Sequence, residues 1–105
     1  MEKDWNNEGD YLQALDWGIK GIDLYSKGDY SQAIDCCDKA LAQNENYEWL
    51  HYNKGISLHE LGRYQEAISC FDKAIALKSD YVHAYNGKGN ALLALKKRNE
   101  AIQMV

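Results

Sequence analysis

Apolar residues recur at intervals of three and four along most of this chain, which is the spacing of an amphipathic helix. Two glycines, Gly28 and Gly62, interrupt that spacing, and each stands where a helix commonly closes with a left-handed residue. Asp29 follows the first glycine and Gln32 stands three residues later, a combination typical of a helix start. The pattern predicts helices over residues 11–26, 30–43, 48–61, 64–77 and 82–95, with a further helix starting at 99.

Comparison of the chain with itself shows one internal offset of 34 residues. Lys20-Gly21-Ile22 returns as Lys54-Gly55-Ile56, and the same offset relates the sets Ala33/Ala67/Ala101, Gly28/Gly62, Asp38/Asp72 and Tyr47/Tyr81. A fixed period of this length is the signature of a repeat architecture. We therefore expect an acidic lead-in over residues 1–13, and then units over 14–47, 48–81 and 82–105, the last of them partial.

Three glycines lie inside the predicted helices, where glycine costs about 1 kcal/mol relative to alanine. They are Gly21, Gly55 and Gly89, and they share one register. Close approach of a neighbouring helix would explain a cost repeated in register. The alanines at 33, 67 and 101 are expected to provide the matching flat surface.

Composition narrows the function classes. The 105 residues include 12 basic and 16 acidic side chains, giving a net charge of −4, and no proline. An acidic balance argues against nucleic-acid or anionic-membrane partners, because both rely on clustered cations. The short run Lys96-Lys97-Arg98 is expected to stabilise the negative C-terminal end of the helix at 82–95. No apolar run approaches the roughly 20 residues of a membrane span, and the start lacks a signal-peptide pattern, so we expect the cytoplasm.

These residues resemble the tetratricopeptide repeat. The resemblance rests on the 34-residue period and on the series Trp17/Tyr85, Gly21/Gly55/Gly89, Leu24/Leu58/Leu92, Ala33/Ala67/Ala101 and Ala40/Ala74. The sequence departs from the family pattern at His51, where an aromatic residue is usual, and at Glu45 and Ser79, where proline is usual. In the third unit Lys96 replaces the turn glycine and Arg98 the following tyrosine.

The resemblance implies an all-α fold, a right-handed superhelix of helix–turn–helix units. It also implies an interaction scaffold whose first helices line a concave groove that binds a peptide or a partner helix. Such scaffolds need no cofactor and have no catalytic activity of their own. The groove residues carried over to this chain are Leu15, Ile22, Tyr25, Trp49, Tyr52, Asn53, Ile56, His59, His83, Asn86 and Asn90, together with Gly18, Glu60 and Leu93.

Helical spacing independently places part of this set on one face. Trp49, Tyr52, Ile56 and His59 are three, four and three residues apart, whereas His51, Gly55 and Leu58 fall on a different face. Trp49 and Tyr52 could hold an apolar side chain, and the amides of Asn86 and Asn90 could hold a peptide backbone. The alternative for Trp49 is packing against the helix at 11–26.

One subclass of the family, the chaperone co-factors, holds a C-terminal carboxylate with lysine, asparagine and arginine. The corresponding positions here are Gly18, Ile22, Asn53, His83 and Gly87, and only Asn53 matches. Without the cations a buried carboxylate would lack its partners. The sequence therefore does not favour Hsp70 or Hsp90 tails as ligands.

Enzymatic and metal sites find no support in the motifs. Cys36, Cys37 and Cys70 lack the CxxC spacing, so we interpret them as reduced, packed thiols with no metal site. The pairs Asp38-Lys39 and Asp72-Lys73 are interpreted as solvated charges on the outer face.

A second class of function is self-assembly. Ala91, Leu92, Leu95 and Ile102, followed by Met104 and Val105, would leave an apolar end on the last unit. Such an end predicts a homodimer through residues 82–105, or a fragment of a longer array. Opposite charges at the two ends would permit head-to-tail stacking instead.

Overall fold

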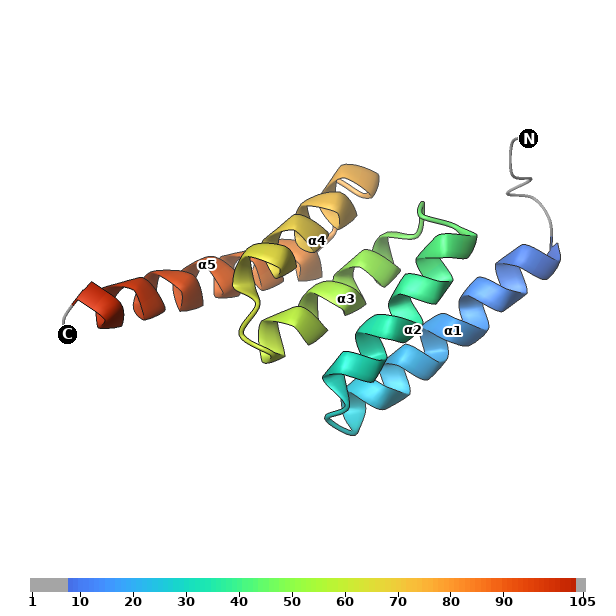
Figure 1. Ribbon diagram of the computed structural model, residues 1–105. Coiled ribbons are helices and arrows are strands. Elements are labelled where there is room, and N and C mark those ends of the chain that lie inside the picture. The colour runs from blue at the N-terminus through green and yellow to red at the C-terminus, as the bar shows by residue number, and fades with distance from the viewer. Residues whose placement is uncertain (1–7, 104–105) are drawn as a thin grey trace.

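The computed structural model describes residues 8–103 as five helices joined by short turns. They are α1 (Glu8–Ser26), α2 (Tyr30–Gln43), α3 (Glu48–Glu60), α4 (Tyr64–Leu77) and α5 (Val82–Gln103), and the described part of the chain contains no strand. Figure 1 shows them stacked side by side in an elongated array, with α1 and α5 at its opposite ends. The fold is the predicted all-α superhelix, with principal extents of 54 × 29 × 25 Å.

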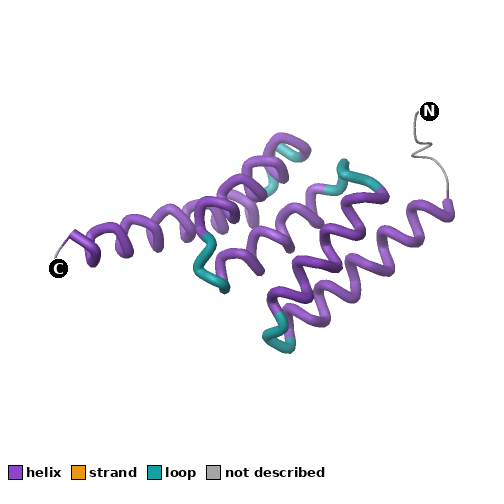
Figure 2. The backbone as a smooth tube through the Cα atoms, in the orientation of Figure 1, coloured by secondary structure: helices purple, strands orange, loops and turns teal. Residues whose placement is uncertain are grey.

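The two turn glycines have the backbone conformation that the sequence predicts. Gly28 and Gly62 have φ angles of +83° and +77°, which side chains with a Cβ rarely adopt. After Gly62, the amide of Arg63 donates to the carbonyl of Leu58 at 2.9 Å, which closes α3 tightly. These turns are among the short loops that separate the helices in Figure 2. Asp29 does precede α2, but its side chain makes no capping hydrogen bond.

The predicted break between residues 95 and 99 is wrong. α5 runs unbroken through Lys96, Lys97 and Arg98 as one helix of 22 residues. A turn here would need a left-handed residue, and no non-glycine residue in the described chain has a positive φ angle. Lysine and arginine favour helix instead. The basic run therefore lies inside a helix rather than at its C-terminal end, and the third unit lacks a second helix within residues 8–103.

The core is centred on Phe71, which is fully buried on α4. It clusters with Ile34, Leu58, Ala67, Cys70 and Ala91, and the half-buried Tyr52, Ile56 and Ile68 pack against this cluster. Ala91 is thus buried, and its predicted place in an exposed apolar end is wrong. Leu92 and Ile102 are 48% and 66% exposed, as that prediction required, and Leu95 is half-buried. Met104 and Val105 lie outside the described residues.

The three in-register glycines differ in the atoms that a Cβ added at each position would contact. A Cβ at Gly21 would lie 3.3 Å from the Ala33 carbonyl oxygen, so the expected close approach is confirmed there. At Gly55 the neighbour is the Phe71 ring, 2.6 Å from the added Cβ, rather than Ala67. Gly89 has nothing within 4 Å, because no helix within residues 8–103 folds back over this part of α5. The expectation therefore fails at Gly89.

Ion pairs join consecutive helix–turn–helix units at the repeat offset. Lys54 on α3 pairs with Asp38 on α2 at 2.6 Å, and Lys88 on α5 pairs with Asp72 on α4 at 2.7 Å. The interpretation of both aspartates as merely solvated outer charges is therefore wrong. Because these pairs are partly exposed, each contributes at most about 1 kcal/mol, and they favour one register between units.

Candidate functional site, a hollow lined by α1, α3 and α5

Side chains from the first helices of the three units meet around one hollow of about 220 Å³. Its described lining consists of Tyr25, Tyr52, Ile56, His59, Glu60, His83, Asn86, Gly87 and Asn90. Of the fourteen positions carried over from the family, it contains the eight at 25, 52, 56, 59, 60, 83, 86 and 90. The chain order α1, α3, α5 places these positions together because each first helix follows its predecessor in the stack (Figure 1).

Six predicted groove residues lie outside the lining of the hollow: Leu15, Gly18, Ile22, Trp49, Asn53 and Leu93. Trp49 packs on α1, as the alternative interpretation expects, because a Cβ at Gly18 would overlap its indole ring. Ile22 is 44% exposed, and Leu15 and Asn53 are half-buried, all three outside the lining of the hollow. The sequence could not show that Trp49 packs on α1 while Tyr52 lines the hollow, because both residues stand on the same helical face.

An aromatic cluster forms the apolar side of the hollow. The Tyr52 ring stacks on Tyr81 with centroids 5.6 Å apart, and it lies 5.9 Å from both Phe71 and His83. Burial, followed by the neighbouring Tyr52 and Glu48, raises the pKa of Tyr81. Tyr52 therefore belongs partly to the core. Its partner Tyr81 is not among the predicted groove residues, and the only signal for it in the sequence is its recurrence 34 residues after Tyr47.

The other side of the hollow is polar and carries one carboxylate. Glu60 Oε1 lies 3.8 Å from His59 Nδ1, and the His59 ring packs on Tyr64 with centroids 5.1 Å apart. Burial, followed by the Glu60 charge, raises the pKa of Tyr25, so its hydroxyl keeps its proton as a hydrogen-bond donor. No lysine or arginine is among the described residues that line the hollow. The arrangement suits neutral or cationic groups better than carboxylates.

The described residues give no sign of reactive chemistry at the thiols. Cys36, Cys37 and Cys70 are buried and free, and burial, followed by the Asp38 charge, raises the pKa of Cys37 to about 12. Its thiol is therefore protonated and unreactive at neutral pH. Within residues 8–103, no three histidine, cysteine or acidic side chains gather as a metal site would require. None of the helices described is long and apolar enough to span a bilayer.

Comparisons with known proteins agree with this architecture. The family described as "Tetratricopeptide repeat" matches residues 49–81, and that described as "TPR repeat" matches residues 21–62. The first TPR of Spaghetti (RPAP3), bound to the HSP90 peptide SRMEEVD, is 32% identical over 86% of this chain and 71% of that one, with a TM-score of 0.79. No curated protein sequence matches the chain at a significant level.

Two further solved structures are similar over most of the chain. The second TPR of Spaghetti (RPAP3), bound to the same HSP90 peptide, is 28% identical, covers 92% of each chain and has a TM-score of 0.80. The second TPR domain of human RPAP3, in complex with the HSP70 peptide SGPTIEEVD, is 29% identical over 90% of this chain and 78% of that one, also with a TM-score of 0.80. With its 34-residue period and its stacked helix pairs, the chain belongs to the tetratricopeptide repeat family.

Proposed function

We propose that this protein is an adaptor that binds an extended peptide or a partner helix in the hollow between α1, α3 and α5, without catalytic activity of its own. The observation that carries the proposal is the convergence of eight predicted groove residues from three helices on one hollow. Similar solved domains were captured with peptides, which supports the same class of function.

The side chains of the hollow define the ligand chemistry. Asn86 and Asn90 are four residues apart on α5, so both amides face the same side and can pair with a peptide backbone. Tyr52 and Ile56 offer an apolar surface next to them. Glu60 adds a negative charge, which favours a peptide with a lysine or arginine near its apolar anchor.

Acidic chaperone tails fit this hollow poorly. The peptides in the similar solved structures end in EEVD. Here Ile22, His83 and Gly87 stand at family positions that carry cations or an asparagine in the carboxylate-binding subclass, and Glu60 would repel a carboxylate. We therefore propose that such tails bind this chain much more weakly than a neutral or basic peptide does.

A displayed peptide library, followed by calorimetric titration of the selected peptides, tests the proposal. Asn86→Ala and Asn90→Ala should each weaken binding by about tenfold, since each removes hydrogen bonds from a desolvated contact. Asn99→Ala is the matched control, because Asn99 is exposed on the same helix outside the hollow. Tight binding of SRMEEVD, or equal effects of all three changes, would contradict the proposal.

Self-association through α5 is a second candidate. Val82, Tyr85, Leu92 and Leu93 are 48–65% exposed along this helix, and Gly89 has nothing within 4 Å. We propose a homodimer through residues 82–105 as the form that would cover them.

We also propose that the protein is located in the cytoplasm. Its three cysteines are free and buried, which suits a reducing compartment.

A further inference from the structure

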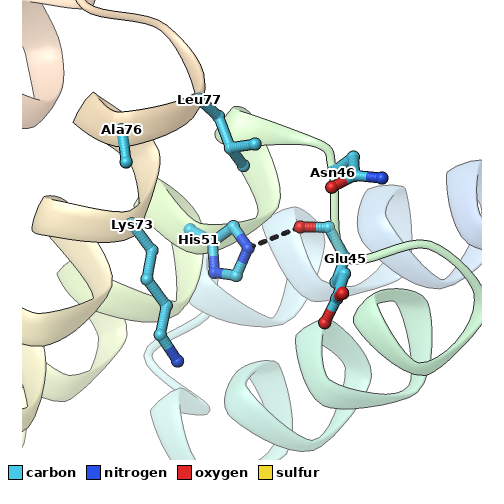
Figure 3. Close-up of a pocket in the computed structure, with 6 residues that line it drawn as sticks. All are labelled: Glu45, Asn46, His51, Lys73, Ala76 and Leu77. Carbon is cyan, nitrogen blue, oxygen red and sulfur yellow. Dashed lines mark hydrogen bonds between the residues drawn. The ribbon is translucent and has the colours of Figure 1, made fainter.

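A second hollow, of about 270 Å³, lies between the loop that precedes α3 and the last turns of α4. Its lining consists of Glu45, Asn46, His51, Lys73, Ala76 and Leu77 (Figure 3). It shares no residue with the groove between α1, α3 and α5. Because His51 and Tyr52 are successive residues of α3, their side chains leave the helix about 100° apart, which separates the two hollows.

The repeat explains why this hollow is open. His51 follows Trp17 by 34 residues, and Lys73 follows Lys39 by the same offset. In the first unit the Lys39 ammonium lies 4.4 Å from the centre of the Trp17 ring, so an indole occupies the space beside that lysine. In the second unit the smaller imidazole of His51 stands in place of the indole. The hollow thus lies beside the position where the first unit has an indole and the second unit has only the smaller imidazole.

The hydrogen bond of the His51 side chain has an equivalent in the third unit. His51 Nε2 donates to the Glu45 carbonyl at 2.8 Å, just as the Tyr85 hydroxyl donates to the Ser79 carbonyl at 2.8 Å one repeat later. A carbonyl only accepts, so the proton is assigned to Nε2, and Nδ1 of the neutral ring is an acceptor. The ring is 7% exposed and lies between the Glu45 carbonyl and the Lys73 chain (Figure 3).

We propose that this hollow binds an indole-type ring, a planar aromatic group with an N–H donor. The ring replaces the indole that the first unit supplies from its own chain. The Lys73 ammonium lies over the face of the ring as Lys39 does over Trp17, Ala76 and Leu77 provide apolar contact, and the N–H donates to His51 Nδ1. The ring comes from a free indole compound or from a tryptophan side chain of a docked protein.

Amide chemical shifts of the whole chain, titrated separately with indole and with N-acetyltryptophanamide, test the proposal. Saturable shifts confined to residues 45–51 and 73–77 are expected. Binding of both probes identifies a tryptophan side chain as an acceptable source, and binding of indole alone identifies a free compound. Shifts that do not saturate, or that spread over the groove residues of α5, would overturn the proposal.

Three variants distinguish binding in this hollow from nonspecific binding of indole to the protein surface. His51→Trp fills the hollow with the ring of the first unit and should weaken indole binding by at least about tenfold through steric exclusion. Lys73→Met keeps an unbranched side chain, shorter by one atom, and removes the charge, so a loss of about two- to fivefold is expected. Lys97→Trp, an exposed position on α5, is the control and should leave indole binding unchanged. Equal indole affinity in the wild type and in both hollow variants would refute the site.

Discussion

Phe71 of α4 lies directly against Gly87 of α5, and a Cβ added at that glycine would stand 2.6 Å from Phe71 Cζ. Gly55 of α3 also lies against the ring, and a Cβ added there would stand 2.6 Å from Phe71 Cε1. One fully buried ring is thus held between the first helices of two successive units. This contact limits how closely α3 and α5 approach each other, and both helices contribute residues to the hollow.

Gly87→Ala and Gly89→Ala should therefore have opposite effects on stability, although they are two residues apart on one helix. Alanine at 87 must displace Phe71, which has no room to move, and overpacking of this kind costs about 1–3 kcal/mol. Alanine at 89 meets nothing within 4 Å and should gain up to about 1 kcal/mol from helix propensity. Urea unfolding of the two variants measures the difference. Equal effects would show that Phe71 does not restrict α5.

Tyr52 should prove to be a structural residue as well as a groove residue. Its ring contacts Phe71 and Tyr81, so Tyr52→Ala removes core packing and should lower the melting temperature by several degrees. Asn86 is exposed, and Asn86→Ala should leave the melting temperature within about one degree. Thermal unfolding followed by circular dichroism distinguishes the two. An unchanged melting temperature in Tyr52→Ala would place its ring outside the core.

The raised pKa of Cys37 predicts that the free energy of unfolding falls at alkaline pH. Burial raises the pKa of its thiol to about 12 in the folded chain, above the ordinary value of 9.0. Because the folded state holds the proton more tightly, the stabilisation is complete below about pH 9. Between pH 9 and 12 it is lost at up to about 1.4 kcal/mol per pH unit. Denaturant midpoints between pH 8 and 10.5 should fall more steeply for the wild type than for Cys37→Ala. Parallel curves would mean that the thiol ionises freely in the fold.

The basic run on α5 should have a structural effect and no affinity for nucleic acid. Arg98 donates to the Gly62 carbonyl at 3.0 Å, and its guanidinium lies 4.7 Å from the centre of the Tyr64 ring. Arg98→Ala should therefore destabilise the chain by about 1 kcal/mol.

With a net charge of −4, the wild type should not be retained on an RNA or DNA column above about 0.15 M salt. Retention at that salt would contradict the prediction.

The proposed homodimer through α5 predicts a mass that depends on concentration. Leu92→Lys places a charge on the exposed surface of α5 and should give a monomer by light scattering at all concentrations, with helicity preserved. Ile19→Lys introduces the same charge at an exposed position of α1, 54% accessible, and should leave the dimer intact. A wild-type monomer mass at both low and high concentration would remove the dimer from consideration.

Much of the architecture follows from the local pattern. Gly28 and Gly62 located two turns correctly because only a residue without a Cβ adopts a positive φ at low cost. The third turn was predicted from the period alone, and it was wrong because Lys96 lacks that freedom. The face of α3 that carries Tyr52 and Ile56 was predictable from spacing, whereas the difference between Trp49 and Tyr52 was not.

The sequence by itself determined the repeat, the helices of the first two units and the set of positions from which the groove is drawn, because these depend on periodicity and backbone freedom close along the chain. The tertiary structure alone decided that Phe71, rather than Ala67, faces Gly55, that Trp49 packs on Gly18, and that Asp38 and Asp72 pair with the next unit. It also decided that His51 leaves a hollow beside Lys73. Each of these depends on how far a side chain reaches across a helix–helix interface, a distance that no spacing along the chain specifies.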